Sequence, residues 1–305
     1  MKLASTTADF RTIDKHDHLE KVRHIAKAGF KYVDLSFYDV TIPKEGPFMQ
    51  DDFASYVKKL KDLADELGVA YVQCHLPGFN PLNESQYEAF VECTNRCIEV
   101  SGMLGIKEAV IHTGTKEGVD KYEYFRLNYE ALKPLFPMME KYGVNVLIEN
   151  SCKPNMQNKY FFFTGEDMKE FINYVNHPLI HACWDLGHAN VEGHHYEDIM
   201  ALGENLHALH VHDNNGKGDE HQALFSGTLN IDEVITALID SGYKGYFTFE
   251  ADSTASFGHT WQLKRHKFEK STLLFNPNTE ILDAAERYNY STGKAILKAY
   301  GVFEE

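Results

Sequence analysis

One kind of joint between a helix and a strand recurs along this chain and constrains its fold more than any other feature. At each joint a glycine follows a stretch of helical periodicity and precedes a short run of apolar and β-branched residues, at Gly29, Gly68, Gly105, Gly143 and Gly242. Glycine tolerates the left-handed backbone conformation at the C-terminal end of a helix. The joints recur about every 30 to 40 residues for most of the chain, which indicates successive β–α units.

Eight apolar runs alternate with eight segments of helical periodicity. The apolar runs cover 2–5, 31–37, 69–75, 108–114, 144–150, 179–185, 206–213 and 245–251. The helical segments cover 17–28, 51–67, 84–104, 121–142, 165–175, 195–203, 230–241 and 281–300. Eight units over about 250 residues are the number and size of a single-domain (β/α)8 TIM barrel, here residues 1–305. The alternative is a doubly wound open sheet, which would need a phosphate-binding glycine fingerprint or a second domain, and neither is visible.

Charge and composition exclude several classes of partner. The formal net charge is -15 with only 30 lysines and arginines, whereas a nucleic-acid surface needs a basic stripe. No stretch reaches the ~18 apolar residues of a membrane span, and residues 1–10 lack the apolar core of a signal peptide. The five cysteines have no disulfide-framework spacing, which is typical of a reducing compartment. We therefore expect a cytoplasmic protein that binds a small molecule, and a homo-oligomer stays open.

Side chains that bind metals stand at the ends of six successive apolar runs, from the third to the eighth: His75, His112, Glu149, Asp185, His210 and Glu250. In a barrel of this kind the ends of the strands meet at the face that carries the chemistry. Glu149 and Glu250 close strongly apolar runs, where a buried carboxylate is costly unless it is paired or bound to metal. Carboxylate and imidazole together suit a divalent metal such as zinc, manganese, iron or cobalt.

Further candidate ligands lie in the stretch 181–221. His188 follows the sixth apolar run, and Asp219 and His221 lie in the loop NNGKGDEH, which cannot be a helix interior or a strand. His212 stands two residues after a candidate ligand on an expected strand, so both side chains point to the same side. Whether His212 joins the site or is structural stays open at this stage.

These residues lie in motifs that resemble the xylose isomerase-like TIM barrel superfamily, which includes sugar phosphate isomerases and epimerases and is related to endonuclease IV. The motifs are VIHTG, LIEN, WDLGH, LHVHDN followed by DEH, and a final FE, and the resemblance covers about residues 1–255. In sugar epimerases of the group four residues hold one divalent metal, and that pattern falls on Glu149, Asp185, His210 and Glu250. In endonuclease IV three zinc ions use five further ligands, which fall on His75, His112, His188, Asp219 and His221. The nine positions alone do not separate the two branches.

The resemblance implies a metal-dependent isomerase or epimerase of a small ketose, polyol or sugar derivative. A metal, Mn²⁺ or Zn²⁺ with Co²⁺, Fe²⁺ or Mg²⁺ as alternatives, would stabilise an enediolate while Glu149 and Glu250 remove and return a proton. His188 would then contact a substrate hydroxyl, and a hydride shift stays open. One alternative is a lyase that dehydrates an inosose-like or keto-sugar substrate. A second is an endonuclease IV-like zinc phosphodiesterase, which the net charge and the few basic loop residues disfavour.

Two segments are candidates for choosing the substrate. Segment 151–164 is rich in aromatics and is interpreted either as a lid or as a strip packed on the barrel rim. Within it, Lys153 is a candidate for an anionic substrate group. Segment 252–280 is an insertion before the last helix, where Trp261 and Arg265 are candidates for contacts with substrate or a neighbouring subunit.

Overall fold

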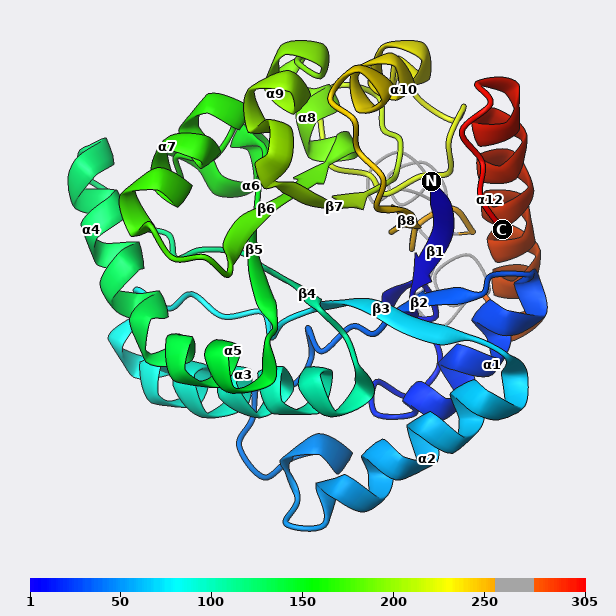
Figure 1. Ribbon diagram of the computed structural model, residues 1–305, viewed down its shortest axis with the longest axis horizontal. Helices are drawn as coiled ribbons and strands as arrows, with labels where there is room; N and C mark the ends of the chain where they lie inside the picture. The colour runs from blue at the N-terminus through cyan, green and yellow to red at the C-terminus, as the bar shows by residue number, and fades with distance from the viewer. Residues whose placement is uncertain (256–276) are drawn as a thin grey trace, which may run out of the picture.

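The computed structural model describes residues 1–255 and 277–305, which form a barrel of parallel strands surrounded by helices (Figure 1). The strands are β1 Lys2–Thr6, β2 Tyr32–Asp34, β3 Ala70–His75, β4 Glu108–Ile111, β5 Asn145–Glu149, β6 Ile180–Asp185, β7 Leu206–His210 and β8 Tyr246–Phe249. Strands adjacent in sequence pair from β1 to β7, and β1 also pairs with β8. The barrel closes between the end of β7 and β8, where the Val211 N–H donates to Thr248 O at 2.8 Å and the Glu250 N–H donates to Val211 O at 3.1 Å. The predicted (β/α)8 barrel is confirmed.

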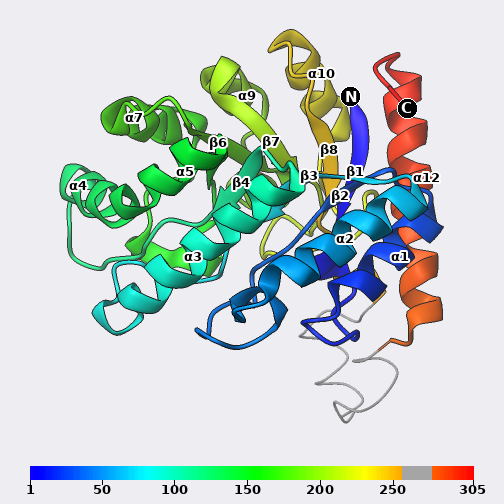
Figure 2. The same ribbon diagram turned by 60° about the horizontal axis from the view of Figure 1, so that its bottom comes forward.

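Helices lie on the outside of this barrel, as α1, α2 and α3 show in Figure 2. The helices are α1 His18–Ala28, α2 Phe53–Leu67, α3 Glu84–Leu104, α4 Lys121–Leu132, α5 Phe136–Tyr142, α6 Lys153–Met156, α7 Gly165–Val175, α8 Leu186–Glu192, α9 Tyr196–Leu202, α10 Ile231–Asp240 and α12 Thr279–Ala299. Short 3₁₀ turns are η1 Thr7–Asp9, η2 Pro47–Met49, η3 Lys133–Leu135, η4 Gln157–Lys159 and η5 Gly203–Asn205. None of the described helices has the length and apolarity that a membrane span requires.

The predicted glycine joints occur where the backbone turns out of a helix. Gly29, Gly68, Gly105 and Gly143 are the C-terminal caps of α1, α2, α3 and α5, with φ between 59° and 112°. Gly242 has φ 75° and follows the cap of α10 by one residue. An L side chain is strained in this conformation, so the repeated glycines set where each helix ends and the next strand begins.

The single helix expected at 121–142 is wrong in one respect, because it is divided into α4, η3 and α5. Pro134 and Pro137 stand in the first turns of η3 and α5. Proline has no N–H, and its ring clashes with the carbonyl four residues earlier. The hydrogen-bond ladder of one continuous helix is therefore interrupted, although the chain keeps its direction along the barrel.

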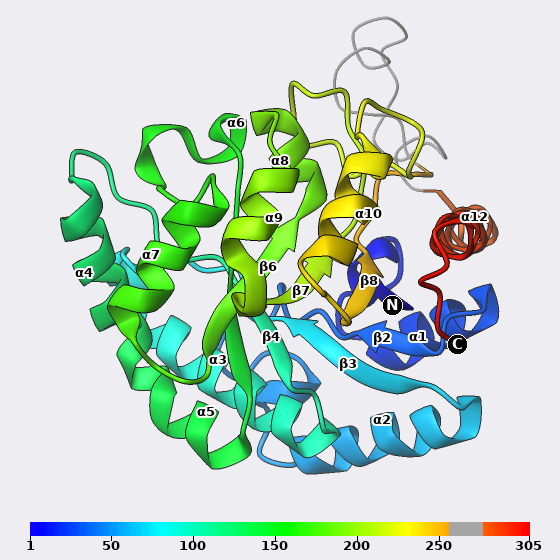
Figure 3. The same ribbon diagram turned by 45° about the horizontal axis from the view of Figure 1, so that its top comes forward.

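After β8 the described chain makes a turn at 252–255 and resumes before α12, the predicted last helix. Trp261 and Arg265, predicted to contact substrate or a subunit, lie outside the described residues. Helix α12 lies beside α1 (Figure 3), and the Lys27 ammonium of α1 donates to Asp283 of α12 at 2.6 Å. This contact joins the last helix of the outer ring, α12, to the first, α1.

Candidate metal centre and active site

The alternation of side chains along the strands brings the candidate ligands to one place. Four inward-facing residues of β4 to β7 form a small apolar layer inside the barrel: Val110, Leu147, Cys183 and Ala208. Residues i and i+2 of a strand point to the same side. The residues two positions further therefore also face the barrel axis, at the carboxyl ends of the strands: His112, Glu149, Asp185 and His210.

A central group of four side chains forms the core of the site. Glu149, Asp185, His210 and Glu250 each offer one ligand atom, and these atoms all lie within 4.8 Å of one another. His210 Nδ1 lies 2.7 Å from Glu149 Oε1 and 3.2 Å from Glu250 Oε2. Three carboxylates at a buried point carry more negative charge than one imidazole can balance, and such burial is costly. The donor set therefore fits a divalent cation.

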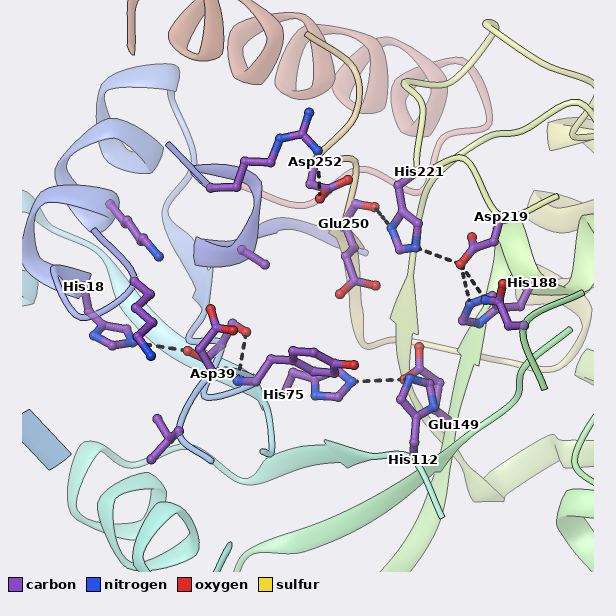
Figure 4. Close-up of a pocket in the computed structure, with 18 of the residues that line it drawn as sticks. His18, Asp39, His75, His112, Glu149, His188, Asp219, His221, Glu250 and Asp252 are labelled. Atoms are coloured by element: carbon purple, nitrogen blue, oxygen red, sulfur yellow. Dashed lines mark hydrogen bonds and ion pairs between the residues drawn. The ribbon is translucent and has the colours of Figure 1, made fainter. Parts of the chain in front are cut away.

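Two further groups flank the central one (Figure 4). His75 and His112 each place Nε2 3.3 Å from Oε2 of Glu149, which thus belongs both to this group and to the central one. On the other side, His188 and His221 each place Nε2 3.1 Å from Oδ2 of Asp219.

Hydrogen bonds to the backbone fix how three of these histidines present their rings. His75 Nδ1 lies 2.7 Å from Leu76 O, His188 Nδ1 lies 3.1 Å from Asn150 O, and His221 Nδ1 lies 3.0 Å from Glu250 O. A carbonyl only accepts, so Nδ1 carries the proton and Nε2 of the neutral ring presents a lone pair. That lone pair faces a carboxylate oxygen, which also only accepts. Such a contact needs a proton on the ring or a cation between the two atoms, and metal-binding histidines have this arrangement.

The pKa values of the two central glutamates shift in opposite directions although burial acts on both in the same direction. Burial raises the pKa of Glu250. At Glu149 burial acts in the same direction, but the facing His112 and His210 outweigh it and hold the pKa of Glu149 well below its ordinary value. Burial lowers the pKa of His188, yet Asp185 and Asp219 outweigh it and raise that pKa to about 10. Protonated His188 thus balances part of the negative charge of Asp185 and Asp219.

Helix α8 follows the candidate ligand Asp185 directly and orients it. Asp185 is the N-cap of α8, and its Oδ1 accepts from the His188 N–H at 2.6 Å. The Asn150 side chain binds both the N–H and the carbonyl of Asp185, at 2.6 and 3.0 Å. His212 Nε2 lies 3.0 Å from the Asp185 carboxylate, and its ring stacks on His221 with centroids 3.9 Å apart. His212 therefore supports the ligands and belongs to none of the ligand groups formed by the described residues.

Sequence reasoning missed Asp34, at the end of β2. It is fully buried, and its Oδ2 lies 3.7 Å from His210 Nε2, on the side of the ring away from Glu149. Asp34 thus faces the back of the candidate ligand. The signal was available, because an acidic residue interrupts the apolar run KYVDLSF.

The ligand groups line one wall of a cavity of about 500 Å³. The β1–α1 segment, Tyr38 and α6 form its other walls. Within 151–164, Asn155 of α6 donates to Asp219 Oδ2 at 2.8 Å and covers the cavity, whereas Phe162 is buried in the core. Lys153, a candidate for an anionic substrate group, is not among the residues that line the cavity. Its ammonium lies 2.7 Å from the Glu192 carboxylate.

A parallel barrel with carboxylates and histidines converging at its C-terminal mouth defines a TIM-barrel protein with a candidate metal centre. The chain belongs to the xylose isomerase-like TIM barrel family, whose family model matches residues 22–271. The predicted family is thereby confirmed.

The curated proteins similar to this chain include an uncharacterized protein, an isomerase and an endonuclease. An uncharacterized protein of Methanocaldococcus jannaschii is 30% identical over 204 residues, which are 64% of this chain and 68% of the relative. An inosose isomerase of Bacillus velezensis is 22% identical over 82% of this chain and 88% of its own. A probable endonuclease 4 of Citrifermentans bemidjiense is 27% identical over 51% of this chain and 59% of its own.

Solved structures share the fold over nearly the whole chain. A D-tagatose 3-epimerase-like protein has a TM-score of 0.71 at 22% identity, covering 99% of this chain and 100% of its own. An IOLI protein with a bound zinc atom has a TM-score of 0.71 at 18% identity, covering 98% and 99%. At these identities the likeness establishes the fold alone.

Proposed function

We propose that this protein is a divalent-metal-dependent isomerase or epimerase of a small ketose, polyol or related sugar derivative. The observation that carries the proposal is the convergence of Glu149, Asp185, His210 and Glu250 beside a cavity of about 500 Å³. Cavities of this size bind small molecules. The inosose isomerase relative and the epimerase-like structure support the same class.

The four central residues would hold the cation, with Zn²⁺ or Mn²⁺ as first candidates and Co²⁺, Fe²⁺ or Mg²⁺ as alternatives. A cation there supplies Lewis-acid polarisation of a substrate carbonyl. The zinc atom bound by the similar IOLI protein supports zinc.

The proton transfer is assigned to the two glutamates. Glu149 at the end of β5 and Glu250 after β8 both line the cavity. One carboxylate removes the proton from the carbon beside the carbonyl, and the other returns a proton to the substrate. The Glu250 side chain is 16% exposed and Glu149 only 1%, so Glu250 is the better placed of the two to meet the substrate first.

The cavity walls would orient the substrate and exclude water. His188 and Asp219 line the cavity beside the central group, where they can contact a substrate hydroxyl. Asn155 and Met156 of α6 cover the same space from the rim. A covered site keeps bulk water from side reactions with the bound substrate.

One experiment separates the reactions that this site can support. Candidate ketoses are incubated with the Zn²⁺- or Mn²⁺-loaded protein in D₂O and followed by proton NMR. Proton transfer predicts deuterium at the carbon beside the carbonyl, and Glu149→Gln and Glu250→Gln are expected to abolish its entry. A hydride shift predicts product without deuterium, and the lyase alternative predicts an unsaturated or dicarbonyl product. Full turnover by either glutamine variant would refute the assignment.

A second candidate, a zinc phosphodiesterase of the endonuclease IV kind, is favoured by one observation. The flanking groups His75–His112–Glu149 and His188–Asp219–His221 supply the further ligands that a metal cluster needs. The net charge of -15 opposes DNA binding. Incision of a duplex with one abasic site by the zinc-loaded protein, abolished by chelation, would establish this activity, and no incision would reject it.

A further inference from the structure

The wall of the cavity that carries the β1–α1 segment contains a buried lysine that no proposed step uses. Lys21 lies in the first turns of α1 and lines the cavity, and it is only 5% exposed. It follows His18 by three residues, which places the two side chains on neighbouring positions of one helix face. Figure 4 shows His18 on the side of the cavity opposite Asp219 and His188.

The Lys21 ammonium has no hydrogen-bond or ion-pair partner among residues 1–255 and 277–305. The other cations on this wall are engaged. Lys15 lies 2.7 Å from Glu45, and Arg11 lies 3.6 Å from Asp252. Lys21 therefore differs from its neighbours in presenting an unused positive charge to the cavity.

This position is unfavourable for a cation in the protein alone. Burial of an ammonium without a partner is costly, and the N-terminal end of a helix carries the positive end of the helix dipole. Burial lowers the pKa of Lys21, and the more distant carboxylates of Asp39, Asp14 and Asp17 oppose that shift. None of these carboxylates forms an ion pair with Lys21 in the described chain. A ligand that brings its own negative charge would satisfy the ammonium.

The charges of the cavity also give a ligand a direction. Glu149, Glu250 and Asp219 line the wall that carries the ligand groups. This wall repels a terminal anion of the substrate, whereas the lysine attracts it. A substrate with an anion at one end would then turn its other end, with the carbonyl and hydroxyls, towards the two glutamates.

We propose that Lys21 binds the terminal anionic group, phosphate or carboxylate, of a sugar-derived substrate whose reacting end lies at Glu149 and Glu250. The inference rests on the proposed function and narrows its substrate class. An ammonium is a point charge with three donors, so it accepts either anion. The subsite is formed by α1 and is separate from the metal ligands.

The test is calorimetric binding of three ketohexose probes that differ only at one end: D-fructose, D-fructose 6-phosphate and D-fructuronate. Wild-type protein is expected to bind one of the two anionic probes at least about tenfold more tightly than D-fructose. Lys21→Met is expected to weaken that anion about 10- to 100-fold, as loss of a charge-assisted hydrogen bond does, and to change D-fructose binding less than about twofold. The stronger of the two anions identifies phosphate or carboxylate as the group that is bound.

Two controls separate a binding role from a general charge effect or a structural role. Lys15→Met changes the charge of the same wall equally but removes a paired lysine, so its effect on the anionic probes should stay below about threefold. Lys21→Arg keeps the charge and should retain most of the preference. Lys21→Met should not lower the thermal unfolding midpoint, since it removes a buried unpaired charge.

The inference is overturned if wild type does not prefer either anion, if Lys21→Met keeps the preference, or if Lys15→Met loses as much. Failure of the proposed function has a different outcome. No deuterium exchange with any probe, together with anion binding that depends on Lys21, would reject the reaction and leave the subsite.

Discussion

Gly187→Ala should disturb the candidate metal centre although it adds only one methyl group. Gly187 lies in the first turn of α8, and a Cβ there would lie 1.8 Å from Cε1 and 2.2 Å from Nδ1 of His212. His212 is fully buried, so the ring has no free space to enter. Its Nε2 lies 3.0 Å from Asp185, and a displaced ring would lose that contact.

The expected magnitude follows from these distances. Overpacking of this kind costs about 1–3 kcal/mol. Each kcal/mol lowers the unfolding midpoint of a chain of 305 residues by about 1.5 °C, at an unfolding entropy of about 2.1 cal/mol/K per residue. Loss of a group that orients a metal ligand lowers metal affinity about 10- to 100-fold. Circular dichroism on heating gives the first quantity, and titration of the chelator-treated protein with Zn²⁺ gives the second.

The controls are a glycine with open space around it and a variant that removes the clashing ring. Gly218→Ala meets nothing within 4 Å and should change stability by less than about 0.5 kcal/mol. The double variant Gly187→Ala with His212→Ala should cost less than the sum of the single changes, because the second change removes the atoms that clash. Strictly additive costs, or Gly187→Ala with wild-type stability and zinc affinity, would refute this explanation.

Three further predictions concern metal binding, pH and the junction of α1 with α12. Adding Zn²⁺ at about 100 times its dissociation constant to chelator-treated protein should stabilise it by about 2.7 kcal/mol. The thermal unfolding midpoint should rise for wild type and rise less for Asp185→Asn. A wild-type midpoint that does not change on adding Zn²⁺ would reject the metal centre. His195 is 4% exposed, and burial lowers its pKa from 6.5 to about 4, so the folded state binds fewer protons than the unfolded state between these values and loses stability as pH falls through this window. Urea unfolding at pH 7 and pH 4.5 should show that His195→Leu removes about 2–3 kcal/mol of this loss. Asp283→Asn breaks the contact with Lys27 at 2.6 Å and should lower the free energy of unfolding by about 1–3 kcal/mol, and equal urea midpoints would contradict that role.

The fold was predictable because the residues that end each helix act locally. A glycine such as Gly68 or Gly143 ends a helix by its own backbone preference, whatever surrounds it. Repetition of that local event determines the barrel. The signal that divides α4 from α5 is also local, because Pro134 and Pro137 stand at the break. The helical periodicity of the apolar residues continues across these prolines, so the periodicity alone predicts one helix.

The candidate ligands were predictable for a similar reason, whereas the cavity walls were not. A histidine or glutamate at the end of an apolar run faces the mouth of the barrel in any chain with this fold. Lys21 looked like an ordinary lysine on an amphipathic helix, and its place in the cavity wall depends on how α1 packs in the barrel. The partner of Lys153 is Glu192 on α8, so no local pattern showed that Lys153 is paired there and does not line the cavity.

The ligand residues are compatible with more than one number of metals, as Glu149 shows. Its two oxygens face different histidines: Oε1 faces His210 in the central group, and Oε2 faces His75 and His112 in the flanking group. A single bridging carboxylate can serve one cation with a set of hydrogen-bonded histidines, or two cations. Both arrangements use the same side chains, so the ligand set is compatible with either. The walls of the cavity therefore discriminate between a sugar enzyme and a metal-cluster nuclease better than the ligands do. A cavity of about 500 Å³ with an ammonium at Lys21 that has no partner among the described residues suits a small anionic substrate, whereas a phosphodiester within DNA needs an open, positively charged surface.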